Sequence, residues 1–261
     1  MTVHVWLMRV DLPAADLTGL ARVLDTDEQR RAAGLAMDDH RRRFIAAHGI
    51  ARVVIGHWLS VPAERIGWRR GPHGKPELTG TPGDTQVSMS HSGELAVLAI
   101  TEGRRCGVDL QQLPDATQAV RLARRFFTAE ETRLVVTGET PAERVRRFGL
   151  LWTRKEACLK VTGGRLMPGL RLPVLGTRAD SGGVLVRDDG GSLPGPYLVC
   201  DLPAPTGFRI SVALDGAHHC DVVRHWWPAE LDYELDQEVF LEPEMMAVEQ
   251  CSTSRPAVTS V

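Results

Sequence analysis

The sequence lacks the features that would place the chain in a membrane or in an oxidising compartment. Its 261 residues contain no apolar run near the roughly 20 residues that a membrane-spanning helix requires. The N-terminus has no charged leader followed by an apolar block. The five cysteines include no CxxC pair and do not indicate a disulfide framework. We therefore expect a cytoplasmic, globular protein with no membrane partner.

Simple metal and phosphate motifs are also missing. The segment "HHCDVVRH" (His218–His225) gathers three histidines and one cysteine, but its spacing matches no zinc finger and no catalytic zinc site. Surface or strand-end histidines are the favoured interpretation. No GxxxxGK[ST] stretch is present, which argues against the P-loop class of Mg²⁺-dependent nucleotide-binding proteins.

Lysine is scarce in this chain. Only three of the 31 basic residues are lysine, and the others are arginine. Lys75 lies in "HGKPEL", whereas Lys155 and Lys160 both lie in "LWTRKEACLK". Because lysine is a compact point charge and arginine a planar fork, a lysine kept in an arginine-rich chain is a candidate for reaching a phosphate oxygen in a crowded site. A solvated helix face is the alternative for the pair in the second segment.

The net charge of −2 conceals an uneven distribution. After Trp226 the chain has eight acidic residues and one basic residue, so the part before it has 30 basic against 25 acidic residues. A mildly basic body is suited to an anionic ligand or partner. We expect residues 229–261 to form an acidic, flexible tail, with folding of that tail onto the basic body as an alternative.

The apolar pattern predicts an α+β fold of two halves, residues 1–104 and 105–228. The first half has a strand at its start, a helical stretch from about Asp25 to Leu59, a turn-rich segment over 71–84, and the strands "QVSMS" and "LAVLAI" on either side of the turn "HSGE". The segment "CGVDLQQL" (Cys106–Leu113) is predicted to form a hairpin with "LAVLAI". Further on, "FRISVAL" followed by "CDVVRHW" is predicted to complete a second sheet.

Two helices of the second half have clear start and stop signals. "TAEE" (Thr128–Glu131) and "TPAE" (Thr140–Glu143) both have the spacing of a capping box, and the second carries proline at the first helical position. We expect the first helix to end near Gly138 and the second to end at Gly163–Gly164.

The second of these helices, Pro141–Thr162, carries a charged pair at the edge of its apolar face. That face is formed by Val145, Phe148, Trp152 and Leu159. Glu156 lies about 40° from Trp152 around the helix, and Lys160 about 40° further. A charge at the edge of a buried stripe is costly, which favours a functional role over an ordinary i,i+4 surface pair.

A second carboxylate lies in the middle of a predicted strand. Alternation in "GVDLQQL" places Asp109 and Gln111 on one face, opposite the apolar residues. Aspartate is disfavoured within strands, so a compensating interaction is expected. A Mg²⁺ ion shared with Glu156 would supply it, and an aspartate that caps a neighbouring turn is the alternative.

Two further groups are candidates for contact with an anion. In "SMSHSGE", Ser90 and His91 are expected in a turn, where side chains and backbone N–H groups can converge on a phosphate. Lys75 is expected on a nearby loop. The run "HRRRF" contains Arg41, Arg42 and Arg43, for which a solvated helix face is the alternative.

Five segments together carry a family resemblance: "GKPEL", "SMSHSGELAVLAI", "GVDLQQL", "RFFTAEE" and "LWTRKEACLK", in this order. They resemble the large, single-chain (Sfp-like) 4′-phosphopantetheinyl transferases, by motif over about residues 20–165 and by layout to about residue 225. The resemblance implies two similar, pseudo-duplicated α+β halves with coenzyme A and Mg²⁺ in the cleft between them. It also implies transfer of phosphopantetheine from coenzyme A to the serine hydroxyl of an apo carrier protein, which releases 3′,5′-ADP.

The resemblance also assigns roles to individual residues. Asp109 and Glu156 would be Mg²⁺ ligands, and Glu156 would also be the base that deprotonates the attacking serine or a relaying water. Lys160 would face the pyrophosphate. The residues implied to contact the nucleotide and its phosphates are Lys75, Ser90, His91, Lys155 and the arginine run Arg41, Arg42 and Arg43.

The chain departs from the family pattern at one position. Members commonly have a second acidic residue where this chain has Gln111. An amide oxygen can still ligate Mg²⁺ or hold its water, but the site has one negative charge fewer. The carrier protein could be of polyketide, nonribosomal-peptide or fatty-acid type, and a monomer is expected because both halves lie in one chain.

A basic nucleic-acid-binding module is the alternative function. "RRRF", "RLARRFF" and "RVRRFGLLW" place arginine beside aromatic residues, which suits phosphate contact and base stacking. This function explains neither the pairing of Asp109 with Glu156 nor the restricted use of lysine, and the isoelectric point of about 6.5 is low for it. We expect no nucleic-acid partner.

Overall fold

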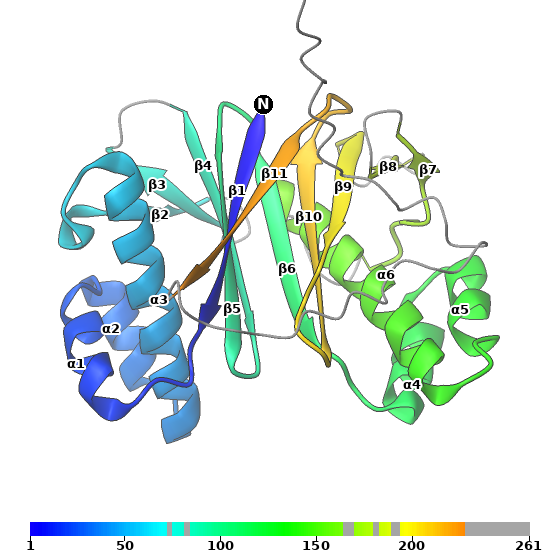
Figure 1. Ribbon diagram of the computed structural model, residues 1–261, viewed down its shortest axis with the longest axis horizontal. Helices are drawn as coiled ribbons and strands as arrows, with labels where there is room; N and C mark the ends of the chain where they lie inside the picture. The colour runs from blue at the N-terminus through cyan, green and yellow to red at the C-terminus, as the bar shows by residue number, and fades with distance from the viewer. Residues whose placement is uncertain (72–74, 81–83, 164–169, 180–182, 189–193, 228–261) are drawn as a thin grey trace, which may run out of the picture.

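The computed structural model describes residues 1–71, 75–80, 84–163, 170–179, 183–188 and 194–227 (Figure 1). The tail expected over residues 229–261, and its alternative contact with the body, lie outside these ranges. So does Gly164, one of the two glycines expected to end the long helix.

The described residues form two larger β-sheets, one two-stranded sheet and two groups of helices. The first sheet contains β1 (Thr2–Arg9), β4 (Thr85–Ser92), β5 (Leu95–Glu102) and β11 (Asp221–Trp227). The second contains β6 (Cys106–Gln112), β7 (Thr177–Arg178), β8 (Val184–Val186), β9 (Tyr197–Leu202) and β10 (Phe208–Asp215). A separate two-stranded sheet pairs β2 (Gly67–Arg70) with β3 (Pro76–Thr79). The helices are α1 (Ala14–Arg22), α2 (Thr26–Ala33), α3 (Asp38–Leu59), the 3₁₀ turn η1 (Ala63–Arg65), α4 (Ala116–Phe126), α5 (Ala129–Val136) and α6 (Pro141–Thr162).

The two larger sheets lie next to each other in the middle of the molecule, with α1–α3 on one outer side and α4–α6 on the other (Figure 1). Strand alternation produces this layering. In β5, every second residue from Leu95 to Ala99 faces the apolar layer between the sheets, and those from Ala96 to Ile100 face α3. A strand buried on both faces reads as a continuous apolar run, as "LAVLAI" does. The predicted α+β class is confirmed.

The local predictions for the second half are confirmed. Thr128 and Thr140 each accept a hydrogen bond from the backbone N–H three residues later, so both capping boxes form. The first helix ends at Val136. α6 ends at Thr162 and is capped by Gly163, whose φ of 72° is the left-handed conformation that glycine adopts easily.

Two strand pairings differ from those predicted. β6 does not form a hairpin with β5; it pairs antiparallel with β10. β11 does not complete the second sheet; it pairs parallel with β1, so the order of the first sheet is β11-β1-β5-β4. Both observed pairings join segments that are far apart in the sequence, and the local pattern of a strand does not encode its partner. The division of the chain at residue 104 stays a prediction.

Three element boundaries also differ from the predicted ones. The predicted helical stretch from Asp25 to Leu59 is two helices. A capping box between Asp25 and Glu28 starts α2, which is capped at its end by Gly34, and α3 begins separately at Asp38. The segment predicted as turns contains β3. β4 continues to Ser92, so Ser90 and His91 lie on a strand and not in a turn.

Candidate functional site

A row of three serines on β4 joins the two halves of the molecule. Alternation places Ser88, Ser90 and Ser92 on one face, and we call these residues the serine seam. The hydroxyl oxygens of Ser88 and Ser92 accept hydrogen bonds of 3.0 Å from the backbone N–H groups of Val108 and Gln112 on β6. Side-chain hydroxyls therefore satisfy the edge of the second sheet where a strand would otherwise pair.

The middle serine of the seam holds the mid-strand carboxylate. Ser90 Oγ donates to Asp109 Oδ1 at 2.8 Å, and Lys160 Nζ donates to the same oxygen at 2.6 Å. The compensating interaction expected for Asp109 is therefore present, and it comes from both halves of the chain. Ser90 thus positions Asp109, and its contact with the nucleotide phosphates stays a prediction.

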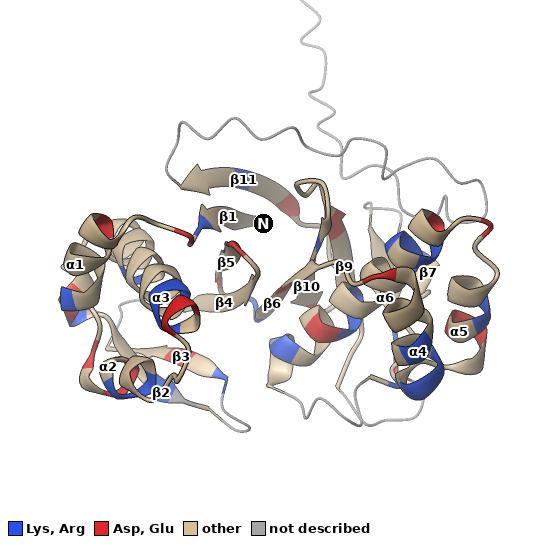
Figure 2. Ribbon diagram, turned by 90° about the horizontal axis from the view of Figure 1, so that it is seen from below, with Lys and Arg blue, Asp and Glu red and all other residues tan. Residues whose placement is uncertain are grey.

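A glycine lets α6 approach β6 closely enough to bring its charged residues to Asp109. A Cβ atom at Gly107 would lie 2.1 Å from the carbonyl oxygen of Ala157 and 2.7 Å from the backbone nitrogen of Val161. In Figure 2 the end of α6 that carries acidic and basic residues lies beside β6. Gly107 is thus the point where the helix crosses the strand, and Glu156 lies one residue before this contact.

Gly107→Ala is expected to lower the free energy of unfolding by about 1–3 kcal/mol, because α6 must move away from the strand. The rate of the reaction implied by the family resemblance is expected to fall by about 10²-fold in the folded variant, because small displacements of reacting groups lower the rate of a reaction strongly. Urea denaturation and steady-state kinetics would measure the two effects. Gly19→Ala is the matched control: no atom lies within 4 Å of a Cβ there, so wild-type activity with unchanged or higher stability is expected.

The consecutive polar residues 153–155 anchor α6 to its surroundings, and Glu156 follows them on the helix. Thr153 Oγ1 lies 2.8 Å from Ser211 Oγ. Arg154 Nη2 donates to Asp201 Oδ2 at 2.7 Å, and both side chains are buried. These bonds set the rotation of α6 on the second sheet.

Lys155 is the third anchor and does not reach the nucleotide region expected for it. Its side chain is fully buried, and Nζ donates to Glu131 Oε2 at 2.6 Å and to the carbonyl oxygen of Leu172. Nζ also lies 4.9 Å from the centre of the Phe127 ring. The interpretation of this lysine as a phosphate ligand is therefore corrected: it pairs with the capping carboxylate of α5.

Glu156 and Asp109 repel each other electrostatically within the same site. Burial and then the Asp109 carboxylate raise the pKa of Glu156 to about 7, and Lys160 offsets part of this rise. Asp109 Oδ2 is buried and has no hydrogen-bond partner among the described residues. A carboxyl group that titrates near neutral pH beside an unpaired carboxylate oxygen is suited to proton transfer and to cation binding.

The residues present fit a Mg²⁺ ion. Mg²⁺ is usually held by one or two carboxylates together with waters and substrate phosphates, and Asp109 and Glu156 would be its protein ligands here. Gln111 lies on the same face of β6, but its amide nitrogen donates to the carbonyl oxygen of Gln112 at 2.7 Å. Over the described part of the chain, no three His, Cys, Asp or Glu side chains gather in a group that could hold a metal ion.

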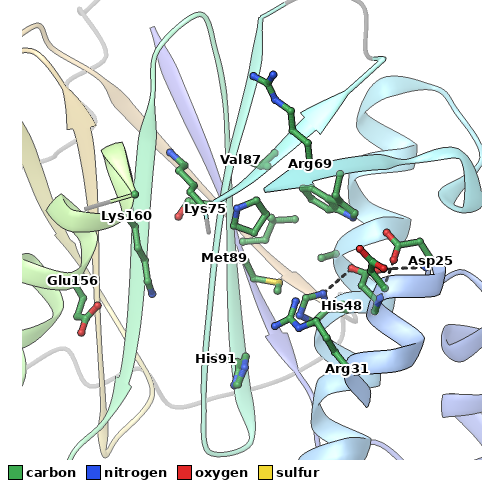
Figure 3. Close-up of a pocket in the computed structure, with 18 of the residues that line it drawn as sticks. Asp25, Arg31, His48, Arg69, Lys75, Val87, Met89, His91, Glu156 and Lys160 are labelled. Carbon is green, nitrogen blue, oxygen red and sulfur yellow. Dashed lines mark hydrogen bonds and ion pairs between the residues drawn. The ribbon is translucent and has the colours of Figure 1, made fainter. Parts of the chain in front are cut away.

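A pocket of about 430 Å³ opens beside this pair, between α2 and α3 of the first half and α6 of the second (Figure 3). Val87, Met89 and His91 of β4 line it, on the face opposite the serine seam. Glu156 and Lys160 line one side, and we call this cavity the inter-half pocket. Its lining residues come from both sides of the predicted division at residue 104, and that division stays a prediction.

His91 and Lys75 reach the inter-half pocket in different ways. Burial, with the neighbouring basic groups His48, Lys160 and Arg31, lowers the pKa of His91, so its surroundings are electropositive. Lys75 Nζ donates to the carbonyl oxygens of Cys106 at 3.0 Å and Val161 at 2.8 Å.

Lys75 therefore belongs to the pocket wall and to the contact between the halves at once. Lys75 directly precedes β3, and its Nζ donates a hydrogen bond to a carbonyl oxygen in the last turn of α6. The carbonyl groups of a last helical turn have no partner within the helix. Burial lowers its pKa.

The arginine run lies outside the inter-half pocket. Arg41 pairs with Asp38, and Arg42 Nη2 donates to the carbonyl oxygen of Leu12 at 3.1 Å. Neither residue lines the pocket, and the same holds for Arg43. The solvated or structural alternative describes this run better than contact with a phosphate.

Other basic residues that sequence reasoning missed line the pocket instead. They are Arg31 of α2, Arg69 of β2 and His48 of α3. A signal for Arg31 existed, because it lies three residues after Glu28 of the capping box and therefore on the same face of α2. The indole of Trp68 also lines the pocket, and its Nε1 is buried without a hydrogen-bond partner among the described residues.

The chain is similar to proteins of one enzyme family. A model of the 4′-phosphopantetheinyl transferase superfamily matches residues 105–213. The 4′-phosphopantetheinyl transferase HetI of Nostoc sp. is 36% identical over 164 residues, which cover 62% of this chain and 68% of the relative. A phosphopantetheinyl transferase of Thraustochytrium sp. is 30% identical over 202 residues, which cover 72% of this chain and 70% of the relative.

Among the described residues, no helix is long and apolar enough to span a bilayer.

Proposed function

The chain belongs to the 4′-phosphopantetheinyl transferase superfamily, and we propose that it moves the phosphopantetheine group of coenzyme A onto a serine hydroxyl of an apo carrier protein with the help of Mg²⁺. The observation that carries this proposal is the meeting of Asp109, Glu156 and Lys160 at one side of the inter-half pocket. The serine oxygen would form a bond to the phosphorus that carries pantetheine. The bond from that phosphorus to the bridging oxygen would break, and 3′,5′-ADP would leave.

Glu156 is suited to the role of base. Its pKa of about 7 lies near the operating pH, where a general base is most effective. It would accept the proton of the serine hydroxyl, directly or through a water. Lys160 would neutralise negative charge on the pyrophosphate, which is the main need in phosphoryl transfer, and His91, whose pKa is lowered, would donate a hydrogen bond as a neutral imidazole. A bound Mg²⁺ would add to this charge neutralisation.

The far wall of the pocket suits the nucleotide part of coenzyme A. Arg31 and Arg69 are the arginines of this wall, and Arg69 also pairs with Glu77 at 2.8 Å. Arginine matches phosphate geometry well. Trp68 offers an aromatic surface and an unpaired N–H donor to a planar base. We propose that the nucleotide lies against this wall and the pyrophosphate near Lys160.

Intact-mass analysis tests the proposal. Apo carrier proteins of polyketide, nonribosomal-peptide and fatty-acid type would each be incubated with the full chain, coenzyme A and Mg²⁺. A gain of one phosphopantetheine group by at least one carrier supports the proposal and identifies the carrier class. No gain with any carrier, together with no binding of coenzyme A, would overturn it. Size-exclusion chromatography with light scattering would test the monomer that we also propose.

Gln111 on β6 leads to a separate prediction for metal affinity. Gln111→Glu is expected to lower the Mg²⁺ concentration needed for half-maximal activity, because it adds a negative charge on the face that carries Asp109. The effect would be measured by Mg²⁺ titration at fixed coenzyme A. An unchanged half-maximal concentration would mean that residue 111 takes no part in metal binding.

A further inference from the structure

Two histidines from distant parts of the chain meet on the first sheet. β1 pairs parallel with β11 in a register that places His4 opposite Val223 and Trp6 opposite His225. Since side chains alternate along a strand, His4, Trp6 and His225 lie on the same face of these neighbouring strands. Figure 1 shows β1 and β11 side by side. The two imidazoles approach each other with His4 Nδ1 3.0 Å from His225 Nε2.

The sequence segment "HHCDVVRH" contains one member of this pair, His225, and its spacing alone matches no zinc site. The other two histidines of the segment lie elsewhere. His219 Nε2 is 3.1 Å from Asp221 Oδ1, and His218 is exposed. The partner of His225 lies 221 positions away in the chain, so no local motif could contain it.

The two facing ring nitrogens share one hydrogen. The rings are nearly parallel, with an angle of 15° between their planes, and their centres are 5.3 Å apart. Because the nitrogens are only 3.0 Å apart, one of them donates a hydrogen bond and the other presents a lone pair. Each ring therefore directs a nitrogen at the same small region of space.

Both imidazoles are neutral near pH 7, which is the state that binds a metal ion. Burial lowers the pKa of His4. Burial, and then the neighbouring His4, lower the pKa of His225. The neutral imidazole is the commonest metal ligand among side chains, whereas a ring protonated at both nitrogens has no lone pair to give.

Aromatic side chains fix the orientation of both rings. Trp6 stacks on His225, with ring centres 4.3 Å apart and an angle of 15° between the planes. The Trp58 ring of α3 lies 4.7 Å from the His4 ring, measured between centres, and its Nε1 donates to Glu102 Oε1 at 2.9 Å. The imidazoles are therefore held in place before a ligand arrives, which lowers the ordering cost of binding.

The separation of the two nitrogens suits two ligands of one metal ion. Bonds from Zn²⁺ to histidine nitrogen are about 2.0–2.1 Å long, so two nitrogens bound at a right or tetrahedral angle lie about 2.9–3.4 Å apart. The observed 3.0 Å falls in this range. The rings must tilt so that both lone pairs point at the ion, but they need not separate.

The histidine pair is accessible and lies apart from the inter-half pocket. His4, Trp6, Trp58 and His225 are each partly exposed, and none of them lines that pocket. Within the described ranges, no third His, Cys, Asp or Glu side chain joins the pair in a group that could hold a metal ion. Water would therefore fill the remaining coordination positions.

We propose that His4 and His225 form a second metal site, which binds a divalent transition-metal ion of the class that prefers imidazole, namely Zn²⁺ or Cu²⁺, and joins β11 to β1. Imidazole suits these ions, whereas Mg²⁺ prefers oxygen ligands. On binding, the hydrogen between the two nitrogens moves through solvent to the far nitrogen of the same ring, and both facing lone pairs bond to the ion. The neutral pair thus releases no net proton. The site does not depend on the proposed function, because its ligands are separate from Asp109 and Glu156.

Copper binding tests the proposal, with the full chain and one equivalent of Cu²⁺ in excess Mg²⁺ and without coenzyme A. Electron spin-echo envelope modulation counts the imidazoles bound to Cu²⁺, and two are expected in the wild type. His225→Phe keeps an aromatic ring on Trp6, and His4→Phe keeps one against Trp58, but each removes one nitrogen ligand. Each variant is expected to bind Cu²⁺ at least about tenfold more weakly and through at most one imidazole, since even the outer partners of metal ligands change affinity by about 10–100-fold.

Thermal unfolding with Zn²⁺ gives a second, independent measurement. An ion that binds only the folded pair stabilises the fold by mass action. In excess Mg²⁺, the Tm of the wild type is expected to rise with Zn²⁺ concentration, and the Tm of both phenylalanine variants is expected to stay constant.

The control and the outcomes separate this site from other places where a metal ion could bind. His218→Asn removes an exposed histidine of the same sequence segment that is not a member of the pair, and wild-type Cu²⁺ binding is expected. His4→Gln and His225→Gln replace any phenylalanine variant that does not fold. Cu²⁺ bound by the wild type without imidazole nitrogen overturns the inference. So does an unchanged affinity and imidazole count in the variants of both paired histidines.

Discussion

Replacing Glu156 with glutamine is expected to lower the rate of carrier modification by about 10²- to 10⁴-fold, the usual contribution of a general base. The amide has nearly the same shape but cannot accept a proton from the serine hydroxyl. Stability is expected to stay the same or rise, because a buried ionisable group is removed. Intact-mass kinetics at saturating coenzyme A would measure the rate. Glu130→Gln, an exposed position on α5, is the control.

The same variant also tests the metal. Since burial and Asp109 raise the pKa of Glu156 to about 7, a divalent cation must displace a proton from this carboxyl group below that pH. Mn²⁺ affinity of the wild type, followed by electron paramagnetic resonance without coenzyme A, is therefore expected to rise up to about pH 7 and to level off above it. In Glu156→Gln the affinity is expected to be weaker and independent of this step. A wild-type rate and wild-type Mn²⁺ binding in the variant would contradict both roles.

Replacing Lys155 with alanine is expected to destabilise the fold by about 3–5 kcal/mol, because it leaves the carboxylate of Glu131 buried without its cation. The same carboxyl group also accepts from the backbone N–H of Val174 at 2.8 Å, so its environment cannot open to water without further losses. Urea denaturation would measure the change. Arg30→Ala, which breaks an exposed pair with Asp27, is the control and is expected to change stability by less than about 1 kcal/mol.

The Lys155 variant also decides between a structural and a ligand-binding role. If the folded protein keeps its affinity for coenzyme A, the buried pair is the role of this lysine. If stability is unchanged and the affinity for coenzyme A falls, the structural interpretation is wrong and the phosphate contact implied by the family resemblance is restored.

Helix geometry contained the information that separates the two lysines of α6. Five residues correspond to about 140° of rotation, so Lys155 and Lys160 cannot share a ligand on one face. Glu156 and Lys160 are four residues apart, so they can share a ligand on one face. The edge position of Glu156 beside Trp152 was a usable signal, because a 22-residue helix with clear caps has a well-defined apolar face.

The basic residues that line the pocket opposite Glu156 could not be identified in the same way. The run of Arg41, Arg42 and Arg43 is conspicuous in the sequence, but it lies outside the pocket. Arg31 and His48 line the pocket only because α2 packs on α3 and both residues contact Phe44. The spacing of Arg31 from Glu28 indicates which face of α2 it occupies, but no local pattern shows that this face meets His48 on a separate helix.

The sequence alone determined the α+β class, the capped helices of the second half and, through the order of its motifs, the family. These features depend on periodicity, on caps and on short motifs, which act within a few residues of one another. Only the tertiary structure decided that β11 pairs with β1 and that the serine seam joins β4 to β6. It also decided that α6 packs closely on Gly107, that Lys155 is buried and that His48 lines the pocket. These outcomes depend on which surfaces meet, and contacts between distant segments are set by the packing of the whole chain.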